Sequence, residues 1–296
     1  MNLKRYNLVV ALIFLLIIAG CSSDNISDTL SDNPDEIVSN NNNNNNRDIL
    51  FHYQLQGANF EDLKNLGAQY LVIDVDDADL TVGEMEELKK LSVVLSYLSI
   101  GEAEDYRDYW QEDWKVGKPS FIDEENPQWA GNYKVKYWDP QWQEIILNKV
   151  KEIKSLGYDG VYLDIIDAYE YYNAKEVLDA KEKMIDFVAR IKSESGLLVF
   201  PQNAVELYES DKYKRIVDGF GAEDTWYDDN NLQEEDYTLS VLSYLREARD
   251  DGKVILSIDY PSEKPKVCDF YTKCNNEEFL CTVSNRNLDF SHPVEC

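Results

Sequence analysis

Carboxylates follow the apolar runs of this sequence at the points where those runs end. Asp164 interrupts the apolar residues 161–166, and Glu223 directly follows residues 219–222. A lone aspartate in such a run is costly to bury unless it has a partner or a purpose. Paired carboxylates suit two chemistries, cation or metal binding and the hydrolysis of a glycosidic bond by an acid with a nucleophile or base. Polar side chains stand in the same position after other runs: Asp74, Asp76, Glu102, Glu104, Asp167, Gln202, Asn203, Asp224 and Asp259.

The composition disfavours several other classes of chemistry. The chain of 296 residues has two histidines, His52 and His292, so a histidine-dependent triad or a multi-histidine zinc site lacks its side chains. The sequence also lacks a phosphate-binding G-x-x-x-x-G-K-[ST] loop, a C-x-x-C pair and a D-x-[DN]-x-[DN]-G calcium loop. Its 57 acidic and 29 basic side chains give a net charge of −28, which disfavours nucleic acid as a partner. We therefore expect no cofactor and no resident metal.

Eight apolar runs with strand character alternate with amphipathic stretches. Asp139 and Pro140 predict the N-cap and first turn of one helix, so capping accounts for Asp139 and we exclude it from the site. Eight β-then-α units over about 250 residues are typical of a (β/α)₈ barrel, in which functional groups lie at the C-terminal strand ends. A doubly wound open sheet is the alternative, because periodicity does not show closure. The predicted strands are 49–55, 70–75, 93–100, 160–165, 197–200, 217–222, 253–258 and 279–283.

The connection after the third predicted strand is long and rich in aromatic residues. It spans residues 103–137, contains Trp110 and adjoins Trp138. Such loops usually build a binding groove over a barrel, where flat rings stack on sugars or cations. The alternative is that the rings pin the loop to the barrel, since each aromatic side chain buries a large area. Further substrate contacts are expected from the other strands and their ends: Tyr53, Asp74, Glu102, Asp167, Asn203, Trp226 and Asp259.

Four strand-end segments occur in an order that is similar to that of one known family. They are YLSIGEAEDYR at 97–107, GYDGVYLDIID at 157–167, GFGAE at 219–223 and VSNRNLD at 283–289. This set resembles glycoside hydrolase family 114, the endo-α-1,4-polygalactosaminidase-like proteins, and is most similar to their bacterial extracellular branch. The resemblance covers nearly all of residues 49–296. It implies a (β/α)₈ barrel that cleaves galactosamine-containing exopolysaccharide.

The resemblance also implies a role for each of the two leading carboxylates. Asp164 takes the place of the nucleophile, and Glu223 takes that of the general acid/base. Leu163 and Ile165 flank Asp164 where the fungal enzymes have Pro and Asn, so the substrate contacts beside Asp164 are expected to differ. A pairing of Asp164 with Asp259 is an alternative. The alternative function is a non-catalytic glycan-binding surface protein, which would tolerate the loss of either carboxylate.

The first 48 residues predict export and membrane attachment. Lys4 and Arg5 precede an apolar run that is too short to span a bilayer but typical of a secretory signal. The run ends Ile-Ala-Gly-Cys, which resembles a bacterial lipobox with Cys21 as the lipidated residue. We expect a signal peptide at 1–21, an Asn-rich disordered tether at 22–48 and the barrel at 49–296, with an uncleaved anchor as the alternative to lipidation. The barrel would then lie outside the cytoplasm, attached to a membrane through Cys21.

Four more cysteines lie close to the C-terminus. In an oxidising compartment they predict two disulfides, in any of three pairings, and free buried thiols are the alternative. The residues are Cys268, Cys274, Cys281 and Cys296.

The acidic side chains lie mainly after residue 48, so the predicted barrel itself carries most of the negative charge. Such a field attracts cations. Deacetylated galactosamine chains are polycations, and we expect a cationic, galactosamine-rich polysaccharide as the substrate of a monomeric protein.

Overall fold

The computed structural model of the protein describes residues 50–289 and Cys296. The predicted signal peptide, the predicted lipidation site Cys21 and the predicted tether lie outside the described residues. Among the described residues, no helix has both the length and the apolar character needed to cross a membrane.

All eight predicted apolar runs form parallel strands, which pair in chain order within two sheets. One sheet has the order β1-β2-β3-β7-β8, and another has the order β13-β12-β9. A parallel bridge between Gln202 and Gly221 joins β8 to β9, and β1 lies beside β13. This circular order confirms the predicted (β/α)₈ barrel. The strands are β1 (Phe51–Gln54), β2 (Tyr70–Asp74), β3 (Val93–Ser99), β7 (Gly160–Asp164), β8 (Leu198–Pro201), β9 (Gly219–Glu223), β12 (Val254–Asp259) and β13 (Leu280–Val283).

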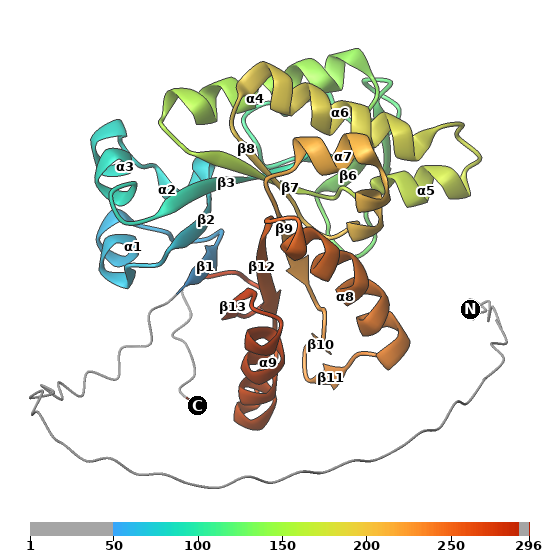
Figure 1. The fold of residues 1–296 in the computed structure, drawn as a ribbon. Coiled ribbons are helices and arrows are strands. Elements are labelled where there is room, and N and C mark those ends of the chain that lie inside the picture. Colours follow the sequence, from blue (N-terminus) through green and yellow to red (C-terminus); the bar gives the residue numbers. More distant parts are fainter. Residues whose placement is uncertain (1–49, 290–295) are drawn as a thin grey trace, which may run out of the picture. The chain divides into compact units, whose positions relative to one another are not determined.

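A helix follows each of the first seven strands of this series, and these helices lie around the outside of the barrel (Figure 1). The Asp139 side chain accepts a hydrogen bond from the Gln141 N–H, so this residue is the N-cap that the sequence predicts. The seven are α1 (Phe60–Leu66), α3 (Val82–Leu88), α4 (Pro140–Ser155), α6 (Ala180–Ser195), α7 (Asp211–Ile216), α8 (Glu235–Asp250) and α9 (Lys264–Asn276). Further helical segments are α2 (Val75–Ala78), α5 (Ala168–Ala174) and η1 (Val205–Glu209).

The interior of the barrel is packed with aromatic side chains. Tyr53, Tyr97, Tyr162 and Tyr260 belong to one buried cluster that is separate from the packing between strands and helices. Room for Tyr162 comes from Gly221 on β9, because a Cβ atom at that position would lie 1.8 Å from the Tyr162 hydroxyl. Residues at i and i+2 on a strand point to the same face, so Tyr162 and Asp164 both project into the barrel. Tyrosine hydroxyl groups in the barrel interior therefore lie near the carboxylates at the strand ends.

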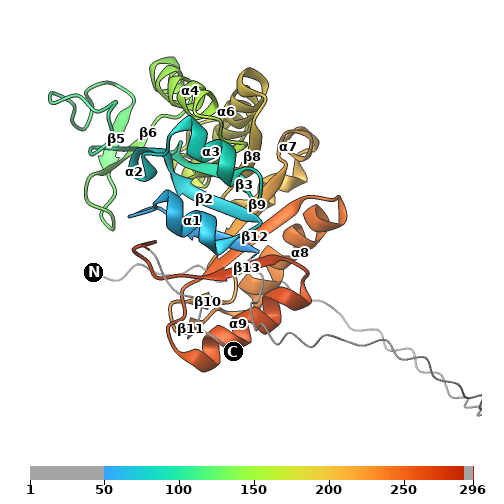
Figure 2. The same cartoon turned by 90° about the vertical axis from the view of Figure 1, so that its left-hand side faces the viewer.

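The long connection after β3 forms a small antiparallel sheet, which the sequence did not predict. Its strand order is β4-β6-β5, with β4 at Glu102–Glu104, β5 at Ile122–Glu125 and β6 at Asn132–Val135. A second short pair, β10 (Tyr227–Asp228) and β11 (Asn231–Leu232), follows β9. In Figure 2, β5 and β6 lie at the upper left, and the pair β10 and β11 lies below β12 and β13. Both insertions follow C-terminal strand ends, where a barrel builds its binding loops.

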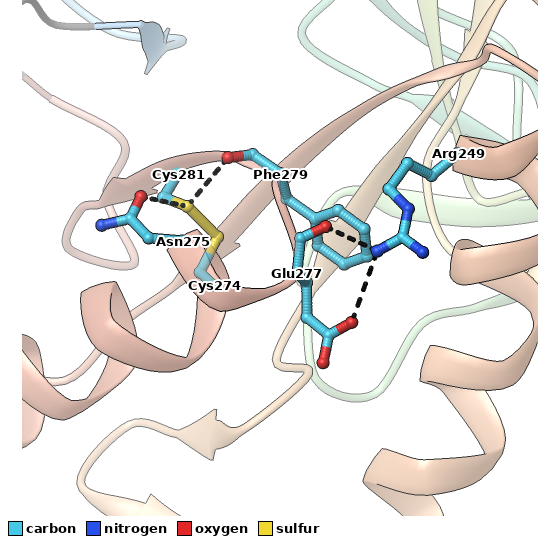
Figure 3. The surroundings of a disulfide bond; sticks show 6 residues. All are labelled: Arg249, Cys274, Asn275, Glu277, Phe279 and Cys281. Carbon is cyan, nitrogen blue, oxygen red and sulfur yellow. Dashed lines mark hydrogen bonds and ion pairs between the residues drawn. A yellow bond between two sulfur atoms is a disulfide. The ribbon is translucent and has the colours of Figure 1, made fainter. Parts of the chain in front are cut away.

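The four C-terminal cysteines form two disulfides. Cys268 pairs with Cys296, and Cys274 pairs with Cys281, which connects α9 to β13 (Figure 3). These bonds confirm the prediction of two disulfides and select one of its three pairings. Beside them, Arg249 donates a hydrogen bond to the carbonyl oxygen of Glu277 at 3.0 Å. The last βα unit of the described barrel is thus cross-linked.

Candidate active site

Asp164 ends β7 and is held by two hydrogen bonds. The Tyr97 hydroxyl donates to Oδ2 at 2.8 Å, and the Ile165 N–H donates to Oδ1 at 2.8 Å. Ile165 has φ of 56°, a conformation that a β-branched residue rarely adopts. The bend brings its carbonyl oxygen against Gly101, where a Cβ atom would lie 2.1 Å away. Such backbone strain concentrates at functional sites.

Glu223 ends β9 and receives hydrogen bonds from two neighbouring strand ends. The Gln202 amide donates to Oε2 at 2.7 Å, and the Tyr260 hydroxyl donates to Oε1. The Arg286 guanidinium lies 3.8 Å from Oε1. On its backbone side, the Glu223 N–H donates to the Asn203 side chain at 3.0 Å. The segments that follow three other strands, β8, β12 and β13, therefore surround Glu223.

The charge of Glu223 acts on the Asp164 carboxylate. Burial and then the negative charge of Glu223 raise the pKa of Asp164 to about 7, while the hydrogen bond from Tyr97 opposes the rise. Burial, Glu223 and Asp164 together raise the pKa of Tyr162, which lies below both. Like-charged neighbours that cannot both ionise easily hold one proton between them. One proton on two carboxylates is the state in which one acts as an acid and the other as a nucleophile.

Tyr53 and Asn203, two predicted substrate contacts, lie next to this pair. The Tyr53 hydroxyl donates to Gln202 at 3.2 Å, and Gln202 in turn donates to Glu223. Asn203 has φ of 57° and holds the backbone of Glu223. Both residues therefore belong to the surroundings of Glu223.

Glu102 and Asp167 are connected to the site through Lys134. Lys134 forms an ion pair with Glu102 Oε1 at 3.2 Å and also counteracts the burial that raises the pKa of Asp167. Asp167 in turn contributes to the raised pKa of Asp164. Glu102 is buried, and its Oε2 has no hydrogen-bond partner among the residues that the structure describes. Asp167 therefore belongs to the electrostatic surroundings of Asp164, and Glu102 binds the same lysine that acts on Asp167.

Asp74 lies in a separate ionic cluster at the end of β2. Arg107 contacts Asp74 at 2.7 Å, Glu104 at 2.6 Å and Asp76 at 3.1 Å, and Lys149 lies 2.9 Å from Asp76. We call these five residues the Arg107 cluster. The Asp74 side chain also accepts a hydrogen bond from the Asp76 N–H and so caps α2.

Asp259 ends β12 and serves as an acceptor for the loop after β9. Its carboxylate accepts the backbone N–H groups of Thr225, Trp226 and Tyr227 at 2.8 to 2.9 Å. Asp259 is fully buried, and this burial raises its pKa to about 7 against the effect of the three N–H groups. These three hydrogen bonds hold the loop that follows Glu223 in place.

The three predicted tryptophans pack against other rings. Trp226 is buried and its ring centroid lies 5.7 Å from that of Phe270. Trp110 lies 4.9 Å from Tyr133, and Trp138 lies 4.7 Å from Tyr172. The large exposed rings of the connection after β3 are Tyr106 and Trp129.

Tyr97, Tyr260 and Arg286 are functional-site neighbours that the sequence reasoning missed. The two tyrosines belong to strands or strand ends, and alternation along β3 and β12 places them on the inner face. Arg286 lies in the last of the four family-like segments, at 283–289, to which no role was assigned.

The described part of the chain, 50–289 with 296, holds no group of three or more His, Cys, Asp or Glu side chains placed to bind a metal ion.

Comparisons with known proteins place this geometry in context. A family model described as glycoside-hydrolase family GH114 matches residues 34–295. An uncharacterized protein of Methanocaldococcus jannaschii is 32% identical over 97% of this chain and 94% of that protein. The glycoside hydrolase domain of PelA from Pseudomonas aeruginosa has a TM-score of 0.65 at 19% identity, covering 82% of this chain and 96% of that one. Ega3 of Aspergillus fumigatus, in complex with galactosamine, has a TM-score of 0.65 at 18% identity, covering 82% and 93%. The two solved structures share the fold of this chain.

Proposed function

Because the chain belongs to glycoside-hydrolase family GH114, we propose that it hydrolyses α-1,4-linked galactosamine-containing polysaccharide with Asp164 and Glu223. The observation that carries the proposal is the pair itself. Two carboxylates end β7 and β9, and the charge of Glu223 raises the pKa of Asp164. The galactosamine bound to Ega3, which has the same fold, supports the choice of sugar.

In the proposed mechanism, Asp164 is the nucleophile and Glu223 is the general acid and base. A carboxylate oxygen of Asp164 attacks the anomeric carbon while Glu223 gives its proton to the leaving glycosidic oxygen. Glu223 then takes a proton from water, and the hydroxide oxygen displaces Asp164 from the sugar. Tyr97 stabilises the departing carboxylate, because its hydroxyl donates to Asp164 at 2.8 Å. Gln202 and Tyr260 orient Glu223 through their hydrogen bonds.

The test is digestion of partly deacetylated galactosamine polymer by the purified protein, followed by mass spectrometry of the fragments. Glu223→Gln is expected to lower the rate by about 10²- to 10⁴-fold, the usual contribution of a general acid or base. Asp139→Asn is the matched control, because Asp139 caps α4. Undiminished cleavage by both Glu223→Gln and Asp164→Asn would contradict the assignment. Binding without any product from the wild-type protein would favour the glycan-binding alternative.

We further propose that the protein is a lipoprotein attached through Cys21. The short apolar run before Cys21 and the oxidised state of the four C-terminal cysteines support an exported barrel. Cys21→Ser is expected to release the protein from the membrane fraction of the cell, with the barrel still folded. Recovery of this variant in the membrane fraction would contradict the proposal.

A further inference from the structure

Arg286 lies in the loop after β13 and contacts four carboxylates of the segment that begins at the end of β9. Its guanidinium forms a bidentate pair with Asp224, with Nη1 2.9 Å from Oδ2 and Nη2 3.0 Å from Oδ1. Nη2 also lies 2.8 Å from Asp228, and Nε lies 2.8 Å from Asp229. Glu223 is the fourth carboxylate, at 3.8 Å from Nη1. The loop after β13 thus holds the loop after β9.

Two contacts of Arg286 lead directly to Glu223. The guanidinium stacks on the Tyr260 ring at 4.1 Å, and the hydroxyl of that same ring donates to Glu223 Oε1. A cation over an aromatic face stabilises the ring position. The second contact is Asp224, which follows Glu223 in a left-handed conformation with φ of 54°. A non-glycine residue in this conformation needs surrounding contacts to hold it.

From these contacts we infer that Arg286 is a positioning residue for Glu223, acting through the Tyr260 ring and the Asp224 carboxylate. The inference rests on the proposed function for the role of Glu223. Arg286 is half-exposed and does not donate to Glu223 within hydrogen-bond distance. Its effect is therefore on the orientation and charge balance of the acid, and not on the covalent steps.

The test replaces Arg286 by Gln and measures kcat and KM separately on galactosamine oligomers. We expect kcat to fall by about 10²-fold, the loss that a 1 Å misplacement of a catalytic group produces. KM should change by less than about threefold, because a misplaced acid affects the transition state more than substrate binding. Arg286→Lys keeps the charge but loses the bidentate fork, so its kcat should lie between those of the wild type and Arg286→Gln.

Arg246→Gln is the matched control. Arg246 makes a bidentate pair with Glu277 at 2.6 and 2.8 Å and is 42% exposed at the side chain, compared with 35% for Arg286. Its loss should leave kcat and KM unchanged. If Arg286→Gln keeps the wild-type kcat, or if its lost activity matches a lost folded fraction, Arg286 is not a positioning residue.

A second measurement separates this inference from the proposed function. Urea unfolding of Arg286→Gln, Glu223→Gln and the double variant gives the coupling between the two side chains without any substrate. We expect the two changes in stability to be non-additive, and additive changes would overturn the inference. If the variants show this coupling but the wild-type protein cleaves no galactosamine polymer, only the proposed function is refuted.

Discussion

Two groups of carboxylates lie at C-terminal strand ends of this barrel, and they differ in what balances their charge. In the Arg107 cluster, Asp74, Asp76 and Glu104 each lie within 3.1 Å of the Arg107 guanidinium. The Asp164–Glu223 pair has hydroxyl, amide and N–H donors close by, and its nearest arginine is 3.8 Å from Glu223. Among residues 50–289 and 296, no lysine or arginine forms an ion pair with Asp164.

This difference indicates that the Arg107 cluster stabilises the fold and that the Asp164–Glu223 pair is suited to catalysis. Burial by itself would lower the pKa of Arg107, but Glu104 and Asp74 raise it above its usual value, so the cation is fixed and the cluster is a stable ionic unit. In the pair, burial and a like charge act in the same direction on Asp164. The charged form of such a carboxylate destabilises the fold, and its pKa lies near neutrality, which suits proton-linked chemistry.

The largest effect is expected from Asp164→Asn. The amide cannot attack the anomeric carbon, so kcat/KM on galactosamine oligomers should fall by at least about 10⁴-fold, as for other lost nucleophiles. The folded pKa of Asp164, about 7, lies above the ordinary value of 3.8, so the native state loses stability as the pH rises from about 4 to about 7. The variant should therefore unfold at a higher temperature than the wild type at pH 8, and at a similar temperature at pH 4. A lower melting temperature at pH 8 would show that Asp164 stabilises the fold.

Arg107→Met is expected to do the reverse. Its loss leaves buried carboxylates without their cation, which costs about 3–5 kcal/mol of unfolding free energy in comparable pairs. Urea unfolding measures the loss, and kcat per folded molecule should stay close to that of the wild type. Arg107→Lys, which keeps the charge, should lose less. A variant that remains as stable as the wild type but has a lower kcat would place the Arg107 cluster in the active site.

The pH dependence of activity distinguishes the two groups further. The active pair must keep one proton, and beside a charged Glu223 that proton leaves Asp164 near pH 7, so kcat/KM should fall as the pH rises and reach half its maximum near pH 7. Tyr97→Phe removes a donor that stabilises the charged form, and the midpoint should move up by about one pH unit. Tyr213→Phe is the control, because that buried hydroxyl has no hydrogen-bond partner in the described part of the chain. An unchanged midpoint in Tyr97→Phe would mean that the profile reports another group.

The sequence predicted the strands and the leading carboxylates better than it predicted their neighbours. Apolar runs mark strands wherever a barrel buries both faces, and all eight did so. The β4-β6-β5 sheet escaped prediction because segments such as Ile122–Glu125 are mostly polar. Tyr97 and Asp164 are 67 residues apart, and their contact depends on the pairing of β3 with β7. Trp226 follows Glu223 closely in sequence, yet its ring packs on Phe270. Contacts of this kind follow from register across strands, which composition and local pattern do not contain.

The smallest expected effect is that of salt, and it also separates the two groups. The screening length falls from about 30 Å at 0.01 M to about 10 Å at 0.1 M ionic strength, so attraction between an acidic barrel and a cationic polymer weakens over that range. We expect kcat/KM on deacetylated polymer to fall several-fold, and that on fully acetylated oligomers, the neutral control, to stay constant. The ion pairs of Arg107 are buried and short, so the melting temperature should change little over the same range. Equal salt responses for the two substrates would mean that the acidity of the barrel does not select for substrate charge.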